Sequence, residues 1–302
     1  MARNFLQYDV FTGEPLTVNQ LAVFPDGRGL ATDRMQSITR EMNFSETTFI
    51  LPAEHPDTNV RMRIFTPGKE LPMAGHPVIG STFALADAGT ITPGATRFVF
   101  GLGIGPTPVD LEWNGDRLRF AWMTQRNPVF DPVIEDRATA AAALGLGIDD
   151  LSPRLPVQVV SCGLPYVMVP LRDREAVDRA TTDLAAMRRL FAVAGVDHGV
   201  FLFAILPAGS EATVYSRMFA PHSGVFEDPA TGSASGPLGA YLVRHGVAGG
   251  AAARQIVSLQ GVAMKRPSRI HIAIEGDADT IKSVKVGGEA VLVARGELLI
   301  PE

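Results

Sequence analysis

The sequence predicts an α+β fold of two pseudo-symmetric halves, each an antiparallel β-sheet or barrel wrapped around a central helix. Three observations lead to this prediction: an internal repeat, many short strand-like segments joined by turn residues, and one uncharged small-residue segment in each half. The 302 residues are enough for two ordinary domains.

The internal repeat is the strongest of these observations. RIFTPGKELPMAGHPVIGS, which begins at Arg63, returns in degenerate form as RMFAPHSGVFEDPATGS, which begins at Arg217. Repetition predicts two similar halves. Both copies contain Arg-x-Phe-x-Pro and, later, x-Pro-x-x-Gly-Ser, and this alignment matches Pro77, Gly80 and Ser81 with Pro229, Gly232 and Ser233. It also places His76 opposite Asp228, and this pair of unlike titratable groups suggests that the halves face each other across a site.

Strand-like segments dominate the chain. They carry β-branched or aromatic residues with partial alternation, and turn residues separate many of them, which favours antiparallel pairing. The segments are FLQYDVF, QLAVFP, TTFILP, NVRMRIF, TRFVFGLG, RLRFAW, QVVSCG, YVMVPL, GVFLFAIL, TVYSRMF, RIHIAI and AVLVARGELLI.

Helices are fewer. A helix over residues 32–42 would place Met35 and Ile38 on one face. Thr182-Asp183 is typical of a helix start, with Gly195 as the matching stop. Residues 136–146 are rich in alanine and favour a helix by propensity.

The two central helices are predicted from VIGSTFALADAG and ATGSASGPLGAYLVRHG. Both are rich in Gly, Ala and Ser and almost free of charge, which is unlike an exposed amphipathic helix. Small residues let a helix lie close to the surrounding backbone, so we expect each to be buried within its own sheet. Pro237 makes the first residue of the second helix uncertain, since proline is tolerated only in the first turn of a helix.

A domain boundary is expected in the polar, proline-bearing stretch at 124–136. The N-terminal half then covers residues 1–125, with residues 285–302 returning to it. The C-terminal half covers 126–284, and the active site is expected in the cleft between the halves.

Composition excludes several classes of function. The chain is 46% hydrophobic and 20% charged with a net charge of -5, so it has no basic footprint for nucleic acid. We find no apolar run that could span a membrane and no signal peptide at the N-terminus, which predicts a cytoplasmic protein. The single Cys162 excludes a disulfide framework, and the histidines lack metal-ligand spacing, so no metal is expected.

His76 and Asp228 each precede a proline that suits the first helical position. His76 is then expected at the N-cap, where histidine is not preferred. It is either a histidine that merely fits or a neutral imidazole at a helix N-terminus that points into the cleft. Asp228 is either an ordinary helix cap or a carboxylate that orients His76.

Glu46 lies in NFSETTFI, in or directly before a strand and among apolar residues. It is either a solvated carboxylate at a sheet edge or a carboxylate in an apolar pocket. Burial would raise its pKa toward neutrality and suit it to take and return a proton. Ser233 with Gly232 could hold a carboxylate at a helix N-terminus, which predicts a small anionic substrate.

These segments resemble a known family. NFSETTFI, RIFTPGKELPMAGHPVIG and RMFAPHSGVFEDPATGSASG are similar to the signature segments of the phenazine-biosynthesis PhzF isomerases, and the resemblance extends to DVFTGEPLTVNQLAVF and VKVGGEAVLVARGEL. It implies the diaminopimelate-epimerase-like fold, a homodimer, and isomerisation of trans-2,3-dihydro-3-hydroxyanthranilate without a cofactor. In that reaction a proton moves from C3 to C1 of the ring, and the resulting enol tautomerises to a ketone.

The resemblance also implies roles for individual residues. Glu46 would be the base that shuttles the proton. His76, Asp228 and Ser233 would complete the catalytic site, and Ser45, Gly75 and Gly232 would bind substrate.

One motif departs from the family pattern, because Val18-Asn19-Gln20 replaces Gly-Asn-Pro. This change alters the expected turn and could alter the substrate pocket.

Alternative functions stay open at this point. The chain could be a PhzF-like epimerase or isomerase of another amino-acid-derived acid, a hydrolase that uses Ser233, His76 and Asp228, or a binding protein without catalysis. A two-thiol epimerase is excluded because the chain has one cysteine.

Overall fold

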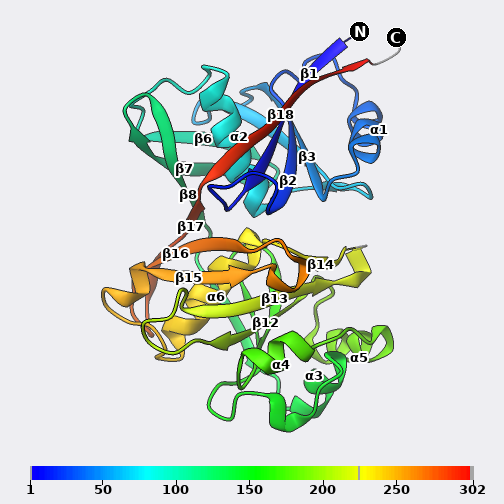
Figure 1. The fold of residues 1–302 in the computed structure, drawn as a ribbon, viewed down its shortest axis with the longest axis vertical. Helices are drawn as coiled ribbons and strands as arrows, with labels where there is room; N and C mark the ends of the chain where they lie inside the picture. Colours follow the sequence, from blue (N-terminus) through cyan, green and yellow to red (C-terminus); the bar gives the residue numbers. More distant parts are fainter. Residues whose placement is uncertain (1, 224, 300–302) are drawn as a thin grey trace. The chain divides into compact units, whose positions relative to one another are not determined.

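The computed structural model describes residues 2–223 and 225–299. The chain divides into two compact units: unit 1 comprises Met1–Thr124 with Gly287–Glu302, and unit 2 comprises Gln125–Val286. In each unit, strands surround one helix (Figure 1). Among the helices that the described residues form, none has the length and apolar character needed to cross a membrane.

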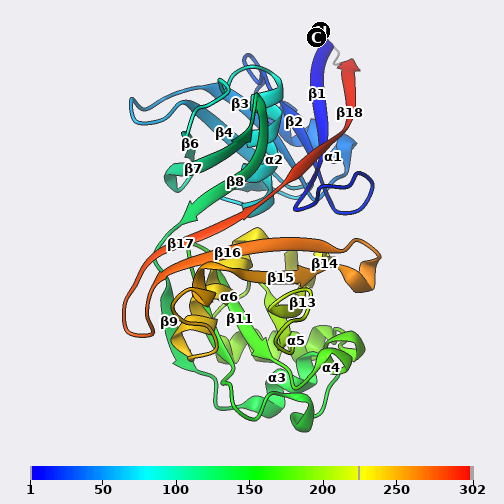
Figure 2. The same ribbon diagram turned by 60° about the vertical axis from the view of Figure 1, so that its left-hand side comes forward.

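The described residues of unit 1 form nine strands and two helices. The strands pair in the sequence β18–β1–β2–β3–β4–β6–β7–β8, and the short β5 also pairs with β4. β1 and β18 run antiparallel along their whole length, from Ala2 opposite Leu299 to Val10 opposite Ala290 (Figure 2). The elements are β1 (Ala2–Val10), β2 (Asn19–Phe24), α1 (Thr32–Met42), β3 (Glu46–Pro52), β4 (Val60–Phe65), β5 (Glu70–Leu71), α2 (Gly75–Asp87), β6 (Arg97–Leu102), β7 (Gly105–Asn114), β8 (Arg117–Gln125) and β18 (Ala290–Leu299).

Unit 2 has the same plan with more helices on its outside. Its elements are β9 (Val129–Val133), α3 (Arg137–Ala143), η1 (Ile148–Asp150), β10 (Gln158–Ser161), β11 (Pro165–Pro170), α4 (Arg174–Arg179), α5 (Leu184–Ala194), β12 (Val200–Ile205), β13 (Val214–Ala220), η2 (Pro221–Ser223), β14 (Val225–Asp228), α6 (Gly232–Arg244), η3 (Ala252–Arg254), β15 (Ile256–Gln260), η4 (Val262–Met264), β16 (Ser268–Gly276) and β17 (Ile281–Gly288).

The strand pairings repeat in the same order in both units, which confirms the predicted duplication. In unit 1, β1–β2 is antiparallel, β2–β3 parallel, β3–β4 antiparallel, β4–β6 parallel and β6–β7 antiparallel. In unit 2 the same series runs through β10–β11, β11–β12, β12–β13, β13–β15 and β15–β16. The α+β class is confirmed, but each sheet is mixed rather than wholly antiparallel. Helices lie in the connections between the parallel pairs, and such crossovers are what parallel pairing requires.

The central helices are buried as predicted, and glycines allow their close approach to the sheets. A Cβ added at Gly80 of α2 would lie 2.6 Å from Cδ2 of Leu21, and one added at Gly239 of α6 would lie 2.4 Å from Cγ2 of Ile272. α6 begins at Gly232 and continues through Pro237, which therefore lies beyond the first turn. Pro237 can remain there because the helix is supported by burial along its whole length, although the proline ring has no N–H to donate.

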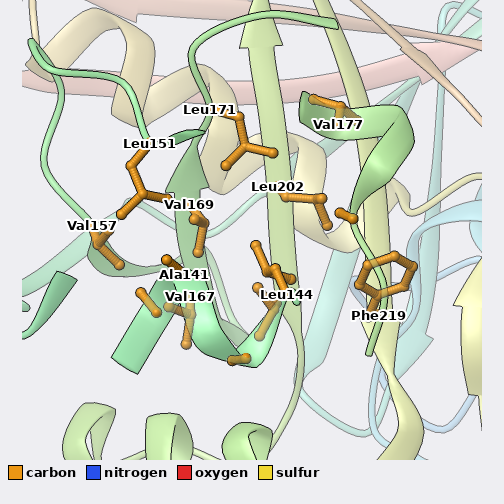
Figure 3. Close-up of a cluster of buried hydrophobic side chains, with 14 of the residues drawn as sticks. Ala141, Leu144, Leu151, Val157, Val167, Val169, Leu171, Val177, Leu202 and Phe219 are labelled. Atoms are coloured by element: carbon orange, nitrogen blue, oxygen red, sulfur yellow. The ribbon is translucent and has the colours of Figure 1, made fainter. Parts of the chain in front are cut away.

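The outer helices of unit 2 cover the face of the sheet opposite α6. Successive residues of β12 alternate between two cores: Val200 and Leu202 pack with α3–α5, whereas Phe201 and Phe203 pack with α6. Figure 3 shows the first of these cores, with Leu202 among side chains such as Leu144. Burial on both faces explains why this strand reads as a continuous apolar run.

The helix boundaries follow the predicted signals. α1 spans the predicted residues 32–42. Asp183 caps α5 by accepting from the backbone N–H of Ala186, and Gly195 ends it with φ 68. α3 is shorter than expected, because Gly145 has φ 63 just beyond its end.

Candidate functional site

The structure corrects the alignment of the two repeat copies. Both central helices contain 13 residues and begin with glycine, so Gly75 corresponds to Gly232. His76 therefore corresponds to Ser233, and the predicted equivalence of His76 with Asp228 is wrong. The second copy has three extra residues between its phenylalanine and its glutamate. The sequence alignment had matched Pro77 with Pro229 by chance. In the corrected alignment Pro229 corresponds to Pro72, five residues earlier in the chain.

A duplicated ion pair supports the corrected alignment. Arg63 on β4 makes two bonds to Glu70 on β5, of 2.7 and 2.6 Å, and its guanidinium lies over the ring of Phe65. Arg217 makes two bonds of 2.8 Å to Glu227 on β14, and its guanidinium lies over Phe219. In each unit this pair ties the strand to the segment that leads into the central helix.

Glu46 and His76 come together in unit 1. Glu46 is the first residue of β3 and His76 the second of α2, and Oε2 of Glu46 lies 3.4 Å from Nε2 of His76. Both side chains are largely enclosed, at 16% and 4% exposure. Burial raises the pKa of Glu46 to about 7, against the lowering effect of a hydrogen bond from Ser45. Glu46 can therefore change protonation state near neutral pH.

The contact with Asn19 indicates which nitrogen of His76 carries the proton. Its amide nitrogen lies 3.2 Å from Nδ1 of His76, and because an amide nitrogen only donates, Nδ1 accepts. The Ser45 hydroxyl donates to Oδ1 of Asn19 at 2.8 Å, which is consistent with this orientation of the amide. The neutral imidazole then carries its proton on Nε2, which faces Glu46. Asn19 is therefore a positioning residue that sequence reasoning noted only for its altered neighbours.

The start of α2 differs from the prediction in detail. The N-cap is Ala74 and not His76, and the side chain of Ala74 makes no capping hydrogen bond. The proline at position 77 is the third helical residue, which moves His76 inside the first turn. Gly75 supplies the first backbone N–H of the helix, so an electropositive helix end adjoins Glu46 and His76.

Asp228 lies at the end of β14 in unit 2 and is 9% exposed. The N-cap of α6 is Thr231, so Asp228 is not the helix cap. One carboxylate oxygen of Asp228 accepts from the Thr231 hydroxyl at 2.6 Å. Gln260 holds the same segment by donating to the Asp228 carbonyl at 2.7 Å and to the Thr231 hydroxyl at 2.9 Å.

Ser233, the second residue of α6, has partners that the sequence analysis missed. Its hydroxyl lies 2.7 Å from the hydroxyl of Tyr166, and Nε2 of His198 lies 3.1 Å from that same tyrosine hydroxyl. Gly232 begins the helix, and its carbonyl accepts from the side chain of Gln125. Tyr166 was visible in the sequence only as the polar member of an otherwise apolar strand.

The structure thus forms two groups from the predicted site residues. Unit 1 brings together Glu46, His76, Ser45 and Gly75. In unit 2, Asp228 is bonded to Thr231 at the N-cap of α6, and Gly232 and Ser233 are the first two residues of that helix. That both groups act on one substrate stays a prediction.

Other polar residues belong to the core. The Ser81 hydroxyl lies 2.9 Å from that of Thr48, and both side chains are fully buried. Cys162 is also buried, and burial raises the pKa of its thiol to about 12, which makes it unreactive. Within the described ranges, His, Cys, Asp and Glu form no group of three that could hold a metal ion.

Comparison with known proteins places this arrangement in a family. The model of the phenazine biosynthesis-like proteins matches residues 8–296. The trans-2,3-dihydro-3-hydroxyanthranilate isomerase of Pseudomonas aeruginosa is 37% identical, over 97% of this chain and 98% of that protein. An uncharacterized isomerase of Mesorhizobium japonicum is 36% identical over 99% of both chains. The crystal structure of a Bacillus anthracis phenazine biosynthesis protein of the PhzF family superposes with a TM-score of 0.86 at 26% identity, covering 99% of this chain and 100% of that one. The chain belongs to the PhzF family of phenazine biosynthesis-like proteins.

Proposed function

We propose that the protein is an isomerase that moves a proton within a small carboxylate substrate and needs no cofactor. The observation that carries this proposal is Glu46, a buried carboxylate with its pKa raised to about 7 and placed 3.4 Å from His76. A base with a pKa near the working pH can take a proton and return it. The first substrate to test is trans-2,3-dihydro-3-hydroxyanthranilate, on which a relative that is 37% identical is named to act.

Glu46 performs both proton transfers in this scheme. Its carboxylate takes the proton as the C3–H bond of the ring breaks, and the released electron pair forms a C3=C4 double bond. The conjugated double bonds shift, and Glu46 returns the proton to C1, where a new C–H bond forms. The product is an enol at C3 that tautomerises to the ketone, and no oxidation or reduction occurs.

His76 and the start of α2 support this chemistry. Nε2 of His76 lies 3.4 Å from Oε2 of Glu46, where it can support the carboxylate as the proton is taken and returned. Ser45 and Gly75 lie beside these residues and are assigned to substrate binding. We assign Asp228, Ser233 and Gly232 to the remainder of the site on the strength of the family motif that contains them.

The decisive test follows the proton. In D2O, the wild type is expected to convert dihydro-hydroxyanthranilate and to place deuterium in the product. Glu46→Gln keeps the shape of the side chain but removes the base, so it is expected to lose conversion and deuterium incorporation. Glu41→Gln, which changes an exposed carboxylate on α1, is the matched control. Equal turnover by wild type and Glu46→Gln would exclude Glu46 as the base.

The substrate alternative is another amino-acid-derived acid of the same family chemistry. Deuterium exchange by the wild type into a panel of such acids, with none into dihydro-hydroxyanthranilate, would favour it. The loss of exchange in Glu46→Gln is expected for either substrate.

Within each unit, the contacts of His76 and Ser233 support proton transfer better than a serine hydrolase. Both ring nitrogens of His76 face groups of its own unit, Asn19 and Glu46. The hydroxyl of Ser233 lies against Tyr166. Covalent labelling of Ser233 by serine-directed acylating reagents would argue for the hydrolase instead.

The homodimer and the cytoplasmic location are further proposals. The proposal of a dimer rests on the family resemblance. It is tested by size-exclusion chromatography with light scattering, which gives the molar mass of the protein in solution. Cell fractionation tests the location.

A further inference from the structure

A chain of three polar side chains runs through unit 2 to the start of α6. Ser233, Tyr166 and His198 are joined by distances of 2.7 and 3.1 Å. The rings of Tyr166 and His198 also meet edge to face, with their centroids 4.9 Å apart. Tyr166 is 2% exposed and Ser233 8% exposed. A buried hydroxyl is almost always hydrogen-bonded, so we expect the hydroxyls of Tyr166 and Ser233 to keep these partners.

Unit 1 contains a chain of the same length at the corresponding place. There Ser45 donates to Asn19, and Asn19 donates to His76. His76 and Ser233 are each the second residue of the central helix. In both units, side chains at or just before the start of the neighbouring parallel strands contact this helical residue directly or through one another. The support is repeated although the residue types have changed.

The donor–acceptor direction of the hydrogen bonds among His198, Tyr166 and Ser233 decides whether the Ser233 hydroxyl can donate its proton to a ligand. The hydroxyl of Tyr166 carries one proton. If this hydroxyl donates to Ser233, it can accept from Nε2 of His198. The proton of Ser233 is then available to a group other than Tyr166. In the opposite direction Ser233 donates to Tyr166 and presents only lone pairs, which an anion would not bind.

We propose that Tyr166 and His198 are positioning residues that turn the Ser233 hydroxyl into a hydrogen-bond donor for the carboxylate of the substrate. His198 donates through Nε2–H to Tyr166, Tyr166 donates to Ser233, and Ser233 donates to the carboxylate. The inference rests on the proposed function in one respect, namely that Ser233 contacts a carboxylate substrate.

The direction of the chain can be measured without any ligand. In protein labelled with 15N-histidine, long-range 1H–15N correlation spectra distinguish a proton on Nε2 from one on Nδ1. The signals of His198 are those lost in His198→Gln. We expect a proton on Nε2 of His198. A bare Nε2 with the proton on Nδ1 would overturn the proposal, whether or not the protein is an isomerase.

Steady-state kinetics then measure how much Tyr166 and His198 contribute to substrate affinity. Tyr166→Phe keeps the ring and removes the hydroxyl, and we expect KM for dihydro-hydroxyanthranilate to rise about tenfold, as for the loss of a hydrogen bond to a charged group. The fall in kcat should be smaller. His198→Ala should resemble Tyr166→Phe, whereas His198→Gln, which keeps an N–H donor near the position of Nε2, should restore most of the affinity.

The matched control is Tyr241→Phe. It also removes a buried hydroxyl in unit 2, one that donates to the carbonyl of Pro156 at 2.6 Å. Its KM should stay close to the wild-type value. An unchanged KM in Tyr166→Phe, or an equal rise in Tyr241→Phe, would overturn the positioning role. If the wild type does not isomerise the substrate, the proposed function fails, and the tautomer of His198 still decides the direction of the chain.

Discussion

At Glu46, two effects act in opposite directions on one carboxyl group. Burial raises the pKa and the hydrogen bond from Ser45 lowers it, with a result of about 7. A more exposed glutamate would be a weaker base, and a buried one without this bond would hold its proton too tightly at neutral pH. The hydroxyl of Ser45 therefore tunes the base, and its single proton is shared between Glu46 and Oδ1 of Asn19.

The activity of the wild type should consequently fall as the pH drops through about 7, because the base must be ionised. Ser45→Ala removes the bond that lowers the pKa of Glu46, so the acidic limb of the kcat/KM profile should move to higher pH. Ser37→Ala, which removes a serine hydroxyl from the exposed face of α1, is the control. A limb that moved to lower pH would contradict this account of the site.

The same pKa shift makes stability depend on pH. The folded protein holds the proton of Glu46 more tightly than the unfolded chain, whose pKa is near the ordinary 4.5. The contribution of Glu46 to stability is therefore fully present below pH 4.5 and is lost as the pH rises through about 7. The shift corresponds to about 3 kcal/mol. In urea denaturation, Glu46→Gln should gain stability relative to the wild type between pH 5 and pH 8, and a constant difference would contradict the shift.

Asn19 offers a second test at the residue scale. Asn19→Leu removes the donor that keeps Nδ1 of His76 as an acceptor. We expect kcat to fall about threefold to tenfold, the effect of one neutral hydrogen bond. The 15N spectrum of His76 should show loss of the single Nε2–H tautomer, which would separate mispositioning from general destabilisation. An unchanged tautomer would mean that other contacts hold the ring.

The central helices show how packing constrains an element. A Cβ at Gly80 would lie within 2.7 Å of both Leu21 and Val10, so Gly80→Ala forces the helix or the sheet to shift. Overpacking of this kind costs about 1–3 kcal/mol. Gly249→Ala is the control, because its Cβ would meet nothing within 4 Å. The free energies of unfolding from urea titration should separate the two variants, and equal values would show that α2 is not tightly packed.

Elements with strong local signals were predictable. α1 has apolar periodicity and α5 has a start signal and a glycine stop signal, and both helices were found where expected. The two-residue β5 and the six-residue α4 were not, because such short elements owe their existence to neighbouring strands and caps. The alignment of the repeat failed for a similar reason, since sequence letters cannot show where an insertion lies between two strands.

At the scale of the whole molecule, the duplication and the α+β class were predictable from the repeat and the strand-like segments. The parallel pairs were not, because alternation along a strand does not reveal the direction of its neighbour. The family motifs contain Glu46 and His76, which the structure brings together. Asn19, Tyr166 and His198 were missed, because their roles arise from contacts between distant segments.

The corrected repeat also shows which spacing along the sequence is the same in both units and which spacing differs. Six positions lead from the ion-paired glutamate to the second residue of the central helix in both units, from Glu70 to His76 and from Glu227 to Ser233. The three additional residues of the second copy lie before the glutamate, around the turn η2 (Pro221–Ser223). The arginine–glutamate pair of each unit thus holds the start of the central helix in the same place relative to the strand, whatever the length of the preceding loop. A three-residue insertion in the turn at 66–69 should therefore leave Glu46 and His76 in place.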